Sequence, residues 1–435
     1  LPRTYFLREM NKILLFLFLV SGLKGLSENN RRLAKLESQS WNQHTLFGSN
    51  AGSYAKSSNF PDLSMVGALQ SVKSLLGTGT LIAPDLVVSA AHIFKNSYEE
   101  DYPDPEDWEF ILAPDFQNAS ESQKFKVTKI IIHPGWLARQ SVTNPLGDGD
   151  SIGVDLCLIQ LDQNITGVFP IALTDGSVES IGQRIILAGF GNLFDGKTGL
   201  AQASNSKRLG GENTLDRVVE KFEVSNLAEG FWGGLLAFDF DSPLGTHNYL
   251  GSNYAPVDNL GTGDSNSVPL AMEASTATGD SGGPAMLWDG VNWRIHGVVS
   301  YGTNGSLYGD VSVFTRLGSH ADWIENYLPT WAEAKFYPNT IWRESDWFGF
   351  FTNYESGWNF HSQFGWFFCS YQKGDTIWIW QNGIGWWWTS RETFPFLYDS
   401  TKQNWFYLDL KSSSSEALFL YDYSLKKWFF ASTTF

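Results

Sequence analysis

The hexapeptide Gly-Asp-Ser-Gly-Gly-Pro at residues 279–284 limits the possible structures of this chain more than any other segment. Its glycines allow a tight backbone in which Gly279 adopts a positive φ and the serine hydroxyl is exposed. A serine hydroxyl is a useful nucleophile only when a base removes its proton and hydrogen-bond donors await the oxyanion. The pattern predicts a nucleophile at Ser281, with the amides of Gly279 and Ser281 as donors. The alternative is a plain Gly-Asp-Ser-Gly turn.

Two other segments carry the partners that such a serine needs. His92 ends a Ser-Ala-Ala-His segment, and Asp155 directly precedes an apolar run at residues 156–161. In this arrangement the histidine acts as general base and then acid, and the aspartate orients its imidazole. Asp148 and Asp150 compete for the aspartate's place, but only Asp155 adjoins a predicted strand. A calcium site on this acidic run is disfavoured, because the spacing is not that of an EF-hand loop.

Around these residues the sequence resembles the trypsin-like serine proteases over roughly residues 60–330. The matching blocks are residues 77–92, 130–136, 155–161, 188–191, 279–284, 297–302 and 313–324. The resemblance implies an all-β fold with two antiparallel six-stranded β-barrels of the chymotrypsin type. It also implies peptide-bond hydrolysis through an acyl-enzyme, with no cofactor and no metal. His133, in an Ile-His-Pro-Gly-Trp turn, is then structural.

The resemblance also places a substrate pocket. Its floor falls at Ser275, beside Thr276, and Ser312 stands where the family often has a glycine and could narrow the pocket. Because no acidic residue stands at the floor, a substrate arginine or lysine would lack a counter-charge. Cleavage after neutral or apolar residues is therefore expected.

The segment 297–302 is expected to line the substrate cleft. Ser300, Tyr301 and Gly302 form its end, with Gly302 at the rim of the pocket. The substrate main chain is expected to pair with Ser300 and Gly302 as an added strand.

The chain departs from animal members of the family in its cysteines. Animal members usually carry one after the catalytic histidine and one before the serine, where this chain has Ile93 and Ala277. Its two cysteines, Cys157 and Cys369, lie in different predicted domains, so a disulfide framework is not expected. These features indicate a bacterial protein, in which Cys157 is a small buried hydrophobe.

The N-terminal region reads as an export signal. Met10, a lysine and a short apolar run predict a signal peptide at residues 10–27, followed by a polar pro-segment or linker at residues 28–60. No Ile-Val-Gly-Gly activation sequence is present, so Asp280 pairs either with a new amine near residues 50–57 or with an internal group. The mature chain is expected to be secreted or associated with the cell envelope.

The charge of the chain restricts its partners. The net charge of −16 disfavours nucleic acid, whose phosphates need clustered lysine and arginine. The apolar run of the signal is too short to span a membrane, and no run of 18 apolar residues follows it. The family resemblance implies a protein or peptide substrate as the partner.

The composition changes after the predicted protease domain, residues 61–330. About a dozen of the 19 tryptophans fall in the last quarter of the chain, and aromatic pairs recur about every 20 residues. This pattern predicts a small module of successive β-hairpins at residues 331–435. Its aromatics either form the module's own core or expose platforms for cell-wall or glycan contact. A different class of function, an inactive protease-like adhesion protein, is the alternative for the whole chain.

Overall fold

The computed structural model describes most of the chain after residue 58. The expected signal peptide lies outside the described residues, as does most of the expected pro-segment. The chain separates into two compact units. The first holds most residues up to Ala321, and the second holds Asp322–Phe435 with the short segments Ile82–Asp85 and Gln163–Pro170. Within the described segments, no helix has the length and apolar character needed to cross a bilayer. The described residues are 45–46, 49–50, 59–72, 76–95, 102–138, 151–174, 179–194, 196, 201–203, 206–223, 232–242, 244–290, 292–303, 307–328, 331–332, 334–337, 340–353, 358–371 and 376–433.

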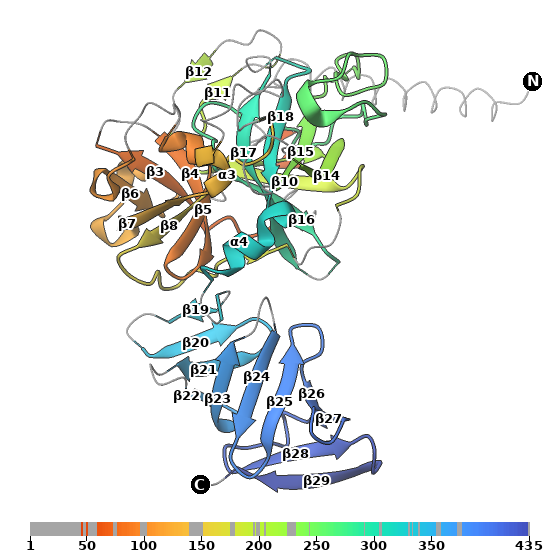
Figure 1. The fold of residues 1–435 in the computed structure, drawn as a ribbon. Helices are drawn as coiled ribbons and strands as arrows, with labels where there is room; N and C mark the ends of the chain where they lie inside the picture. The colour runs from red at the N-terminus through yellow and green to blue at the C-terminus, as the bar shows by residue number, and fades with distance from the viewer. Residues whose placement is uncertain are drawn as a thin grey trace, which may run out of the picture. The chain divides into compact units, whose positions relative to one another are not determined.

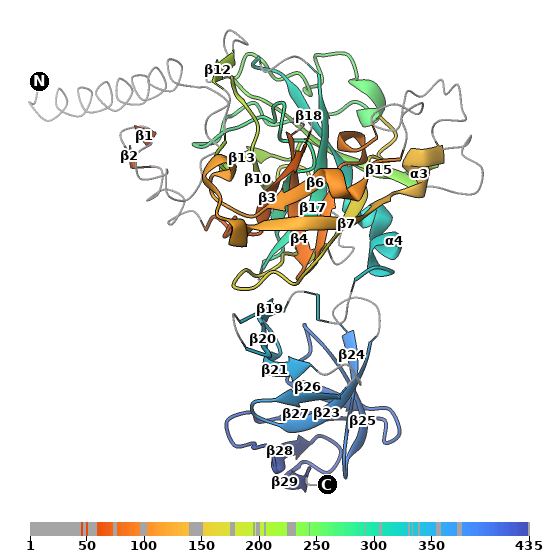
Figure 2. The ribbon, with the colours of Figure 1, turned by 90° about the vertical axis from the view of Figure 1, so that its left-hand side faces the viewer.

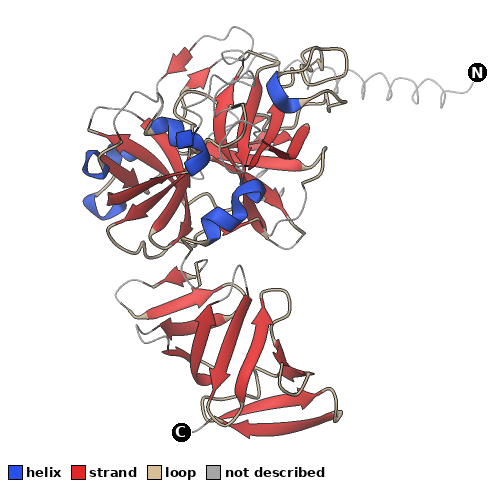
Figure 3. Ribbon diagram, in the orientation of Figure 1, coloured by secondary structure: helices blue, strands red, loops and turns tan. Residues whose placement is uncertain are grey.

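A closed antiparallel barrel forms the first part of unit one (Figures 1 and 3). Its described strands follow the order β3-β4-β5-β8-β7-β6. The short apolar strand β5 is buried at every position, whereas β7 carries exposed residues between its buried ones, as expected for a strand with one solvated face. The strands are β3 (Val66–Ser71), β4 (Leu76–Ala83), β5 (Leu86–Ser89), β6 (Trp108–Ile111), β7 (Lys124–Ile132) and β8 (Cys157–Leu161).

An eight-stranded sheet forms the second part of unit one, in the order β13-β10-β16-β17-β18-β15-β14, with β9 added in parallel to β17. Six strands were expected here, and the described sheet has eight. Asn213 connects β13, at one edge of the sheet, with β15 near the other edge. Its side-chain amide donates to the carbonyls of Asp239 in β15 (3.1 Å) and of Ala274 (3.0 Å). The strands are β9 (Ala172–Leu173), β10 (Arg184–Gly189), β13 (Leu209–Thr214), β14 (Arg217–Glu223), β15 (Trp232–Asp239), β16 (Pro284–Trp288), β17 (Trp293–Gly302) and β18 (Val311–Arg316).

Helices are short in the described chain. The α-helices are α3 (Pro134–Ala138) and α4 (Ala321–Glu325), and the 3-10 turn η1 (Ala91–Ile93) follows β5. Other 3-10 turns are η2 (Pro105–Asp107), η3 (Phe116–Asn118), η4 (Glu121–Gln123), η6 (Asp258–Leu260) and η7 (Leu317–His320). Two small strand pairs are β1 (Thr45–Leu46) with β2 (Ser49–Asn50), and β11 (Leu193–Phe194) with β12 (Ala201–Ala203). The all-β fold class expected from the sequence is confirmed.

The second unit holds one antiparallel sheet whose eleven described strands pair in chain order (Figures 1 and 2). Its inner face packs apolar side chains such as Phe351, Phe367 and Leu420, none more than 4% exposed, into one core. The strands are β19 (Lys335–Phe336), β20 (Trp342–Ser345), β21 (Gly349–Asn353), β22 (Trp358–His361), β23 (Gly365–Tyr371), β24 (Thr376–Gln381), β25 (Gly385–Ser390), β26 (Phe396–Asp399), β27 (Asn404–Leu408), β28 (Ala417–Asp422) and β29 (Lys427–Ser432).

Candidate active site

Three side chains from distant parts of the sequence meet in unit one. His92 lies in the turn η1 after β5, Asp155 lies just before β8, and Ser281 lies in the turn before β16. His92 Nε2 is 2.9 Å from Ser281 Oγ, and His92 Nδ1 is 2.7 Å from Asp155 Oδ2. The imidazole therefore bridges a hydroxyl and a carboxylate, which is the geometry needed to take a proton from the serine.

Asp155 is fully buried and held from several sides. Its Oδ1 accepts the backbone N–H of His92 at 2.9 Å, and its Oδ2 accepts the Ser300 hydroxyl at 2.6 Å. The Thr315 hydroxyl donates to its backbone carbonyl at 2.9 Å. Burial alone would raise the pKa of Asp155, but the charge and hydrogen bonds of His92, with the Ser300 hydroxyl, outweigh burial and lower it. The carboxylate therefore stays ionised beside the imidazole.

The turn that presents Ser281 is fixed by the neighbouring aspartate. The carboxylate of Asp280 is buried and accepts the backbone N–H groups of Gly191 and Ala277, each at 2.8 Å. A side chain at Gly191 would not fit, because a Cβ there would lie 2.3 Å from Asp280 Oδ2. Asp280 was expected to pair with an internal group or with a new amine near residues 50–57. Residues 51–57 lie outside the described residues.

Two amides of this turn are available to a ligand. Gly279 has a φ of +99°, the left-handed region that glycine adopts without strain. Among the hydrogen bonds of the described residues, neither the Gly279 N–H nor the Ser281 N–H donates to a protein acceptor. These are the two donors that the sequence suggests for an oxyanion.

A sequence model of the trypsin family matches residues 52–215 and 257–324, which together make up more than half of the chain. The chain belongs to the trypsin family. The matched ranges contain His92, Asp155 and Ser281, so the family match and the geometry concern the same residues. This places the chain among the trypsin-like serine peptidases, whose substrates are proteins.

The trypsin-family pocket residues named from the sequence lie together in part. Ser312 Oγ is 2.9 Å from both the Ser275 and the Thr276 hydroxyl oxygens, and it accepts the Thr276 backbone N–H at 3.1 Å. All three residues are buried. The structure thus brings the expected pocket floor together as a cluster of hydroxyl groups.

The other residues named for the trypsin-family cleft lie at the end of β17. Ser300 is buried, and its hydroxyl donates a hydrogen bond to Asp155, a side-chain contact that the sequence did not indicate. The Tyr301 hydroxyl donates to Asp258 Oδ2 at 3.0 Å, and Gly302 is exposed. Sequence reasoning about the main chain of this strand therefore missed the side-chain role of Ser300.

Two acidic alternatives and one histidine stand outside this group. Asp148 and Asp150 lie outside the described residues. His133 is buried, with Nε2 3.2 Å from His320 Nδ1, and its Nδ1 accepts the Gly135 N–H at 3.1 Å. The described residues contain no group of three or more His, Cys, Asp or Glu side chains that could hold a metal ion.

The cysteines are not reactive partners of the site. Cys157 and Cys369 are both free thiols. Burial, together with the charge of Asp155, raises the pKa of Cys157 well above its usual value, and burial raises the pKa of Cys369 to about 12. The Cys157 thiol contacts the Ala90 carbonyl at 3.4 Å and fills space in the barrel.

Proposed function

We propose that this chain is a serine endopeptidase that hydrolyses peptide bonds through an acyl-enzyme. His92 takes the Ser281 proton as Oγ attacks the substrate carbonyl, and the amides of Gly279 and Ser281 stabilise the oxyanion. The protonated imidazole then gives its proton to the leaving amine. Water hydrolyses the ester with His92 again as base, which returns the Ser281 hydroxyl. One observation carries the proposal: Ser281 is hydrogen-bonded to His92, and His92 is hydrogen-bonded to the buried Asp155.

Covalent labelling tests the proposal directly. Wild-type protein and Ser281→Ala are treated with a fluorophosphonate probe, which reacts with an activated serine. Labelling of the wild type alone, together with cleavage of a casein substrate, is the expected result. A wild type that neither labels nor cleaves would instead favour the inactive, protease-like binding protein.

Substrate choice follows from the hydroxyl cluster at the pocket floor. Ser275, Thr276 and Ser312 offer hydroxyl groups and no charge, so a substrate arginine or lysine would be desolvated without a counter-ion. We infer a preference for neutral or apolar residues at the cleavage site. A peptide library with all residues at that position tests this, and preferred cleavage after arginine or lysine would contradict it.

Substrate binding by strand addition is supported by the pairing of β17. Its pairing with β16 ends at Val298, whereas its pairing with β18 continues to Gly302. No described strand occupies the β16 side of Ser300, Tyr301 and Gly302. We infer that substrate main chain adds there as an antiparallel strand. N-methylation of the substrate amide that faces Gly302 should raise KM, and an unchanged KM would oppose this mode.

We also propose that the protein is exported by a bacterium and acts outside the cytoplasm. The support is the basic and apolar start at residues 10–27. Expression from Met10 in a bacterial host, followed by cell fractionation, tests it. Recovery outside the cytoplasm with a new N-terminus near residue 28 is expected. Retention of the uncleaved chain in the cytoplasm would contradict it.

A second function is supported by the outer face of the sheet in unit two. Residues paired across neighbouring strands lie on the same face of a sheet. In β24 and β25, Trp380 pairs with Trp386 and Trp378 with Trp388, and aromatic pairs on the same face continue across the strands on both sides. Trp387 between them is buried at 3% exposure, so the three tryptophans alternate. The aromatics of this outer face are Trp342, Phe350, Trp358, Phe360, Trp366, Phe368, Trp378, Trp380, Trp386, Trp388, Phe396, Tyr398, Trp405, Tyr407, Phe419, Tyr421, Trp428 and Phe430.

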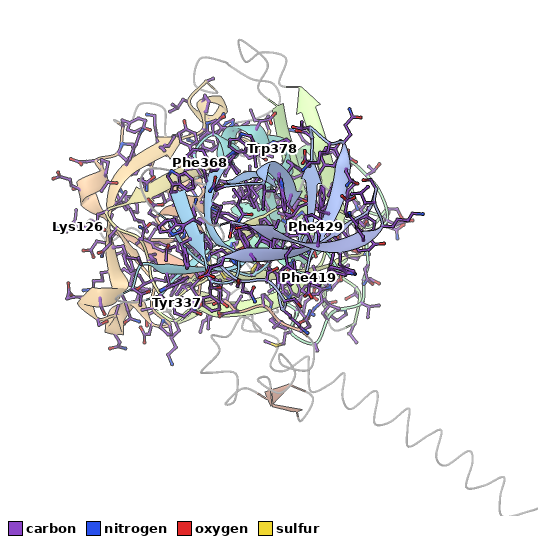
Figure 4. All side chains as sticks on the ribbon, turned by 90° about the horizontal axis from the view of Figure 1, so that it is seen from below. Lys126, Tyr337, Phe368, Trp378, Phe419 and Phe429 are labelled. Atoms are coloured by element: carbon purple, nitrogen blue, oxygen red, sulfur yellow. The ribbon has the colours of Figure 1, made fainter. Side chains whose placement is uncertain are left out.

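Ring spacing on this outer face suits a sugar polymer. Neighbouring ring centroids lie between 4.6 Å, for Phe419 and Phe430, and 6.4 Å, for Trp342 and Phe360. This is about the length of one pyranose unit, whose C–H face stacks on aromatic rings. Figure 4 labels Phe368, Trp378 and Phe419 from this face.

The charges of this face and of the chain favour a neutral ligand over an anionic lipid surface or a second copy of the chain. From β21 to β29, no outward position of the described residues carries a charged side chain. In β19 and β20, which continue this face, Lys335 and Glu344 lie opposite each other as a pair of opposite charges. The chain's net charge of −16 opposes both an anionic lipid surface and a second copy of the chain. We therefore infer that the outer face binds a neutral polysaccharide.

Sedimentation with insoluble polysaccharides tests this second function. Full-length Ser281→Ala, which cannot digest itself, is mixed with cellulose, chitin or β-1,3-glucan. In this background, Trp366→Ala with Trp386→Ala should weaken binding at least about tenfold, or about 1.4 kcal/mol. Leu425→Ala, at a residue 62% exposed in the β28–β29 turn, is the control and should bind normally. Absence of binding to all three polymers, or self-association or flotation with lipid vesicles through this face, would overturn the inference.

A further inference from the structure

Thr78 connects the first barrel to the turn that carries the nucleophile. It lies in β4, is fully buried, and belongs to the segment Gly77-Thr78-Gly79. Its hydroxyl donates to the Gly279 carbonyl at 2.8 Å and accepts the Phe190 N–H at 3.2 Å. Its backbone N–H donates to the Ser281 carbonyl at 2.8 Å. One residue of β4 thus binds the carbonyls of both residues whose amides are the proposed oxyanion donors.

Hydrogen bonds restrain Gly279 on both sides of its Cα. A peptide unit is planar, so holding its carbonyl also sets the direction of the N–H on the other side. The Thr278 carbonyl, which shares a peptide plane with the Gly279 N–H, accepts the Asn192 N–H at 2.9 Å. The Thr78 hydroxyl holds the next plane through the Gly279 carbonyl. Both planes flanking the Gly279 Cα are therefore tied to neighbouring chain segments.

The turn that carries Ser281 packs tightly against Thr78 and Ser89. The Thr78 carbonyl accepts the Ser89 hydroxyl at 2.8 Å, three residues before His92. A Cβ at Gly282 would lie 2.1 Å from both the Thr78 carbonyl oxygen and Ser89 Oγ. The turn at Ser281 thus packs directly on β4 and on the residues that lead to the histidine.

We propose that the Thr78 hydroxyl is a positioning group for the oxyanion hole. It holds the Gly279–Asp280 peptide plane and so restrains rotation at the Gly279 Cα, next to the Thr278–Gly279 plane whose N–H points at the developing oxyanion. The inference rests on the proposed peptidase function. Its effect belongs to the transition state, because the oxyanion forms only there, and so kcat should fall while KM stays nearly constant.

Substitutions at two neighbouring threonines of β4 test the proposal. Thr78→Val keeps the shape but removes the hydroxyl, leaving the Gly279 carbonyl and the Phe190 N–H unpaired. Thr80→Val is the matched control, since Thr80 is equally buried and its hydroxyl has no hydrogen-bond partner among the described residues. Thr78→Ser restores the hydroxyl, and comparison with Thr78→Ala asks the same question if the valine variant fails to fold.

The expected result is a fall in kcat of about tenfold for Thr78→Val, smaller than the 10²–10³ lost with an oxyanion donor itself. KM should change less than about twofold, and a peptidyl trifluoromethyl ketone, which forms a tetrahedral adduct, should bind about tenfold more weakly. Thr78→Ser should recover both quantities, and Thr80→Val should match the wild type.

Three outcomes would overturn the positioning role while the peptidase function stands. These are equal losses of kcat in Thr78→Val and Thr80→Val, no recovery of kcat in Thr78→Ser, or a change confined to KM. A wild type without turnover would overturn the peptidase function and this inference together. Melting temperatures of all four variants separate a loss of folded protein from a loss of kcat.

Discussion

The Ser300 hydroxyl donates to Asp155 Oδ2 across 2.6 Å, the same oxygen that lies 2.7 Å from His92 Nδ1. A strand of the second sheet therefore helps to hold a carboxylate that precedes a strand of the first barrel. The hydroxyl supports the ionised form of Asp155 and restricts the angle at which that carboxylate meets the imidazole.

Removal of this hydroxyl should weaken catalysis without abolishing it. For Ser300→Ala we expect kcat/KM to fall about 3- to 10-fold, the value of one hydrogen bond to a buried group. Steady-state kinetics on a peptide substrate measures it. Ser319→Ala, which removes a hydroxyl that donates to the Glu220 carbonyl, is the control and should leave kcat/KM unchanged. Unchanged kinetics in Ser300→Ala would oppose a role for this contact.

Substitution of Ser312 should change which residue is accepted at the cleavage site. Its hydroxyl contacts both Ser275 and Thr276, so Ser312→Gly removes the group that ties the pocket floor together and opens space there. The ratio of kcat/KM for phenylalanine over alanine substrates should rise at least about tenfold, as expected when a pocket gains a methylene-sized volume. Paired peptide substrates that differ only at this position measure the ratio. A constant ratio would place the specificity pocket elsewhere.

Buried carboxyl groups in the second sheet should make the protein less stable at alkaline pH. Burial, with the charge of Asp239, raises the pKa of Asp216 to about 8, and burial, with the charges of Asp239 and Asp216, raises that of Asp241 to about 9. Between the unfolded value of 3.8 and these values, the folded state holds protons that the unfolded state has released. The free energy of unfolding should therefore fall as pH rises through this window and level off above about pH 9.

Asp241→Asn tests this dependence, because one oxygen of the Asp241 carboxyl lacks a hydrogen-bond partner among the described residues. The variant should be more stable than the wild type by at least about 1.4 kcal/mol at pH 9, the value of one pKa unit, and the difference should shrink toward pH 4. Denaturant unfolding at pH 4, 7 and 9 measures it. A difference that is constant with pH would contradict the assignment.

The buried histidine pair should limit stability in acid. Burial, with the charge of Arg316, lowers the pKa of His320 to about 4 despite its hydrogen bond with the Gly153 carbonyl. Below pH 6.5 the unfolded chain binds a proton at His320 that the folded chain does not bind. Stability should therefore fall by about 1.4 kcal/mol per pH unit between pH 6.5 and 4 through this histidine. Unfolding curves of the wild type and His320→Gln should show a shallower slope in the variant. Parallel slopes would show that other groups cause the acid instability.

The sequence predicted the parts of this structure that depend on local patterns. The apolar runs before His92 and after Asp155 gave strands β5 and β8, and the glycines around Ser281 gave the tight turn. The recurring aromatic pairs after residue 331 indicated β-hairpins, and the described strands of that part of the chain form a single antiparallel sheet.

Contacts between distant segments could not be read in the same way. Thr78 meets Gly279 across 201 positions, and Ser300 meets Asp155 across 145. Nothing local to either residue indicates its partner. Likewise, the repeats at the end of the chain predicted a module of successive hairpins, but the pairing between hairpins that makes one continuous sheet depends on register over the whole module.

The division of the site between two halves of unit one has a consequence for biosynthesis. His92, Asp155 and Thr78 come from the first barrel and its borders, and Ser281 and Ser300 come from the later sheet. A nascent chain whose first barrel alone has folded holds a base and a carboxylate but has no nucleophile beside them. The hydroxyl reaches the imidazole only after the second sheet has formed, so the reactive centre does not exist while unit one is still partly unfolded and vulnerable to cleavage.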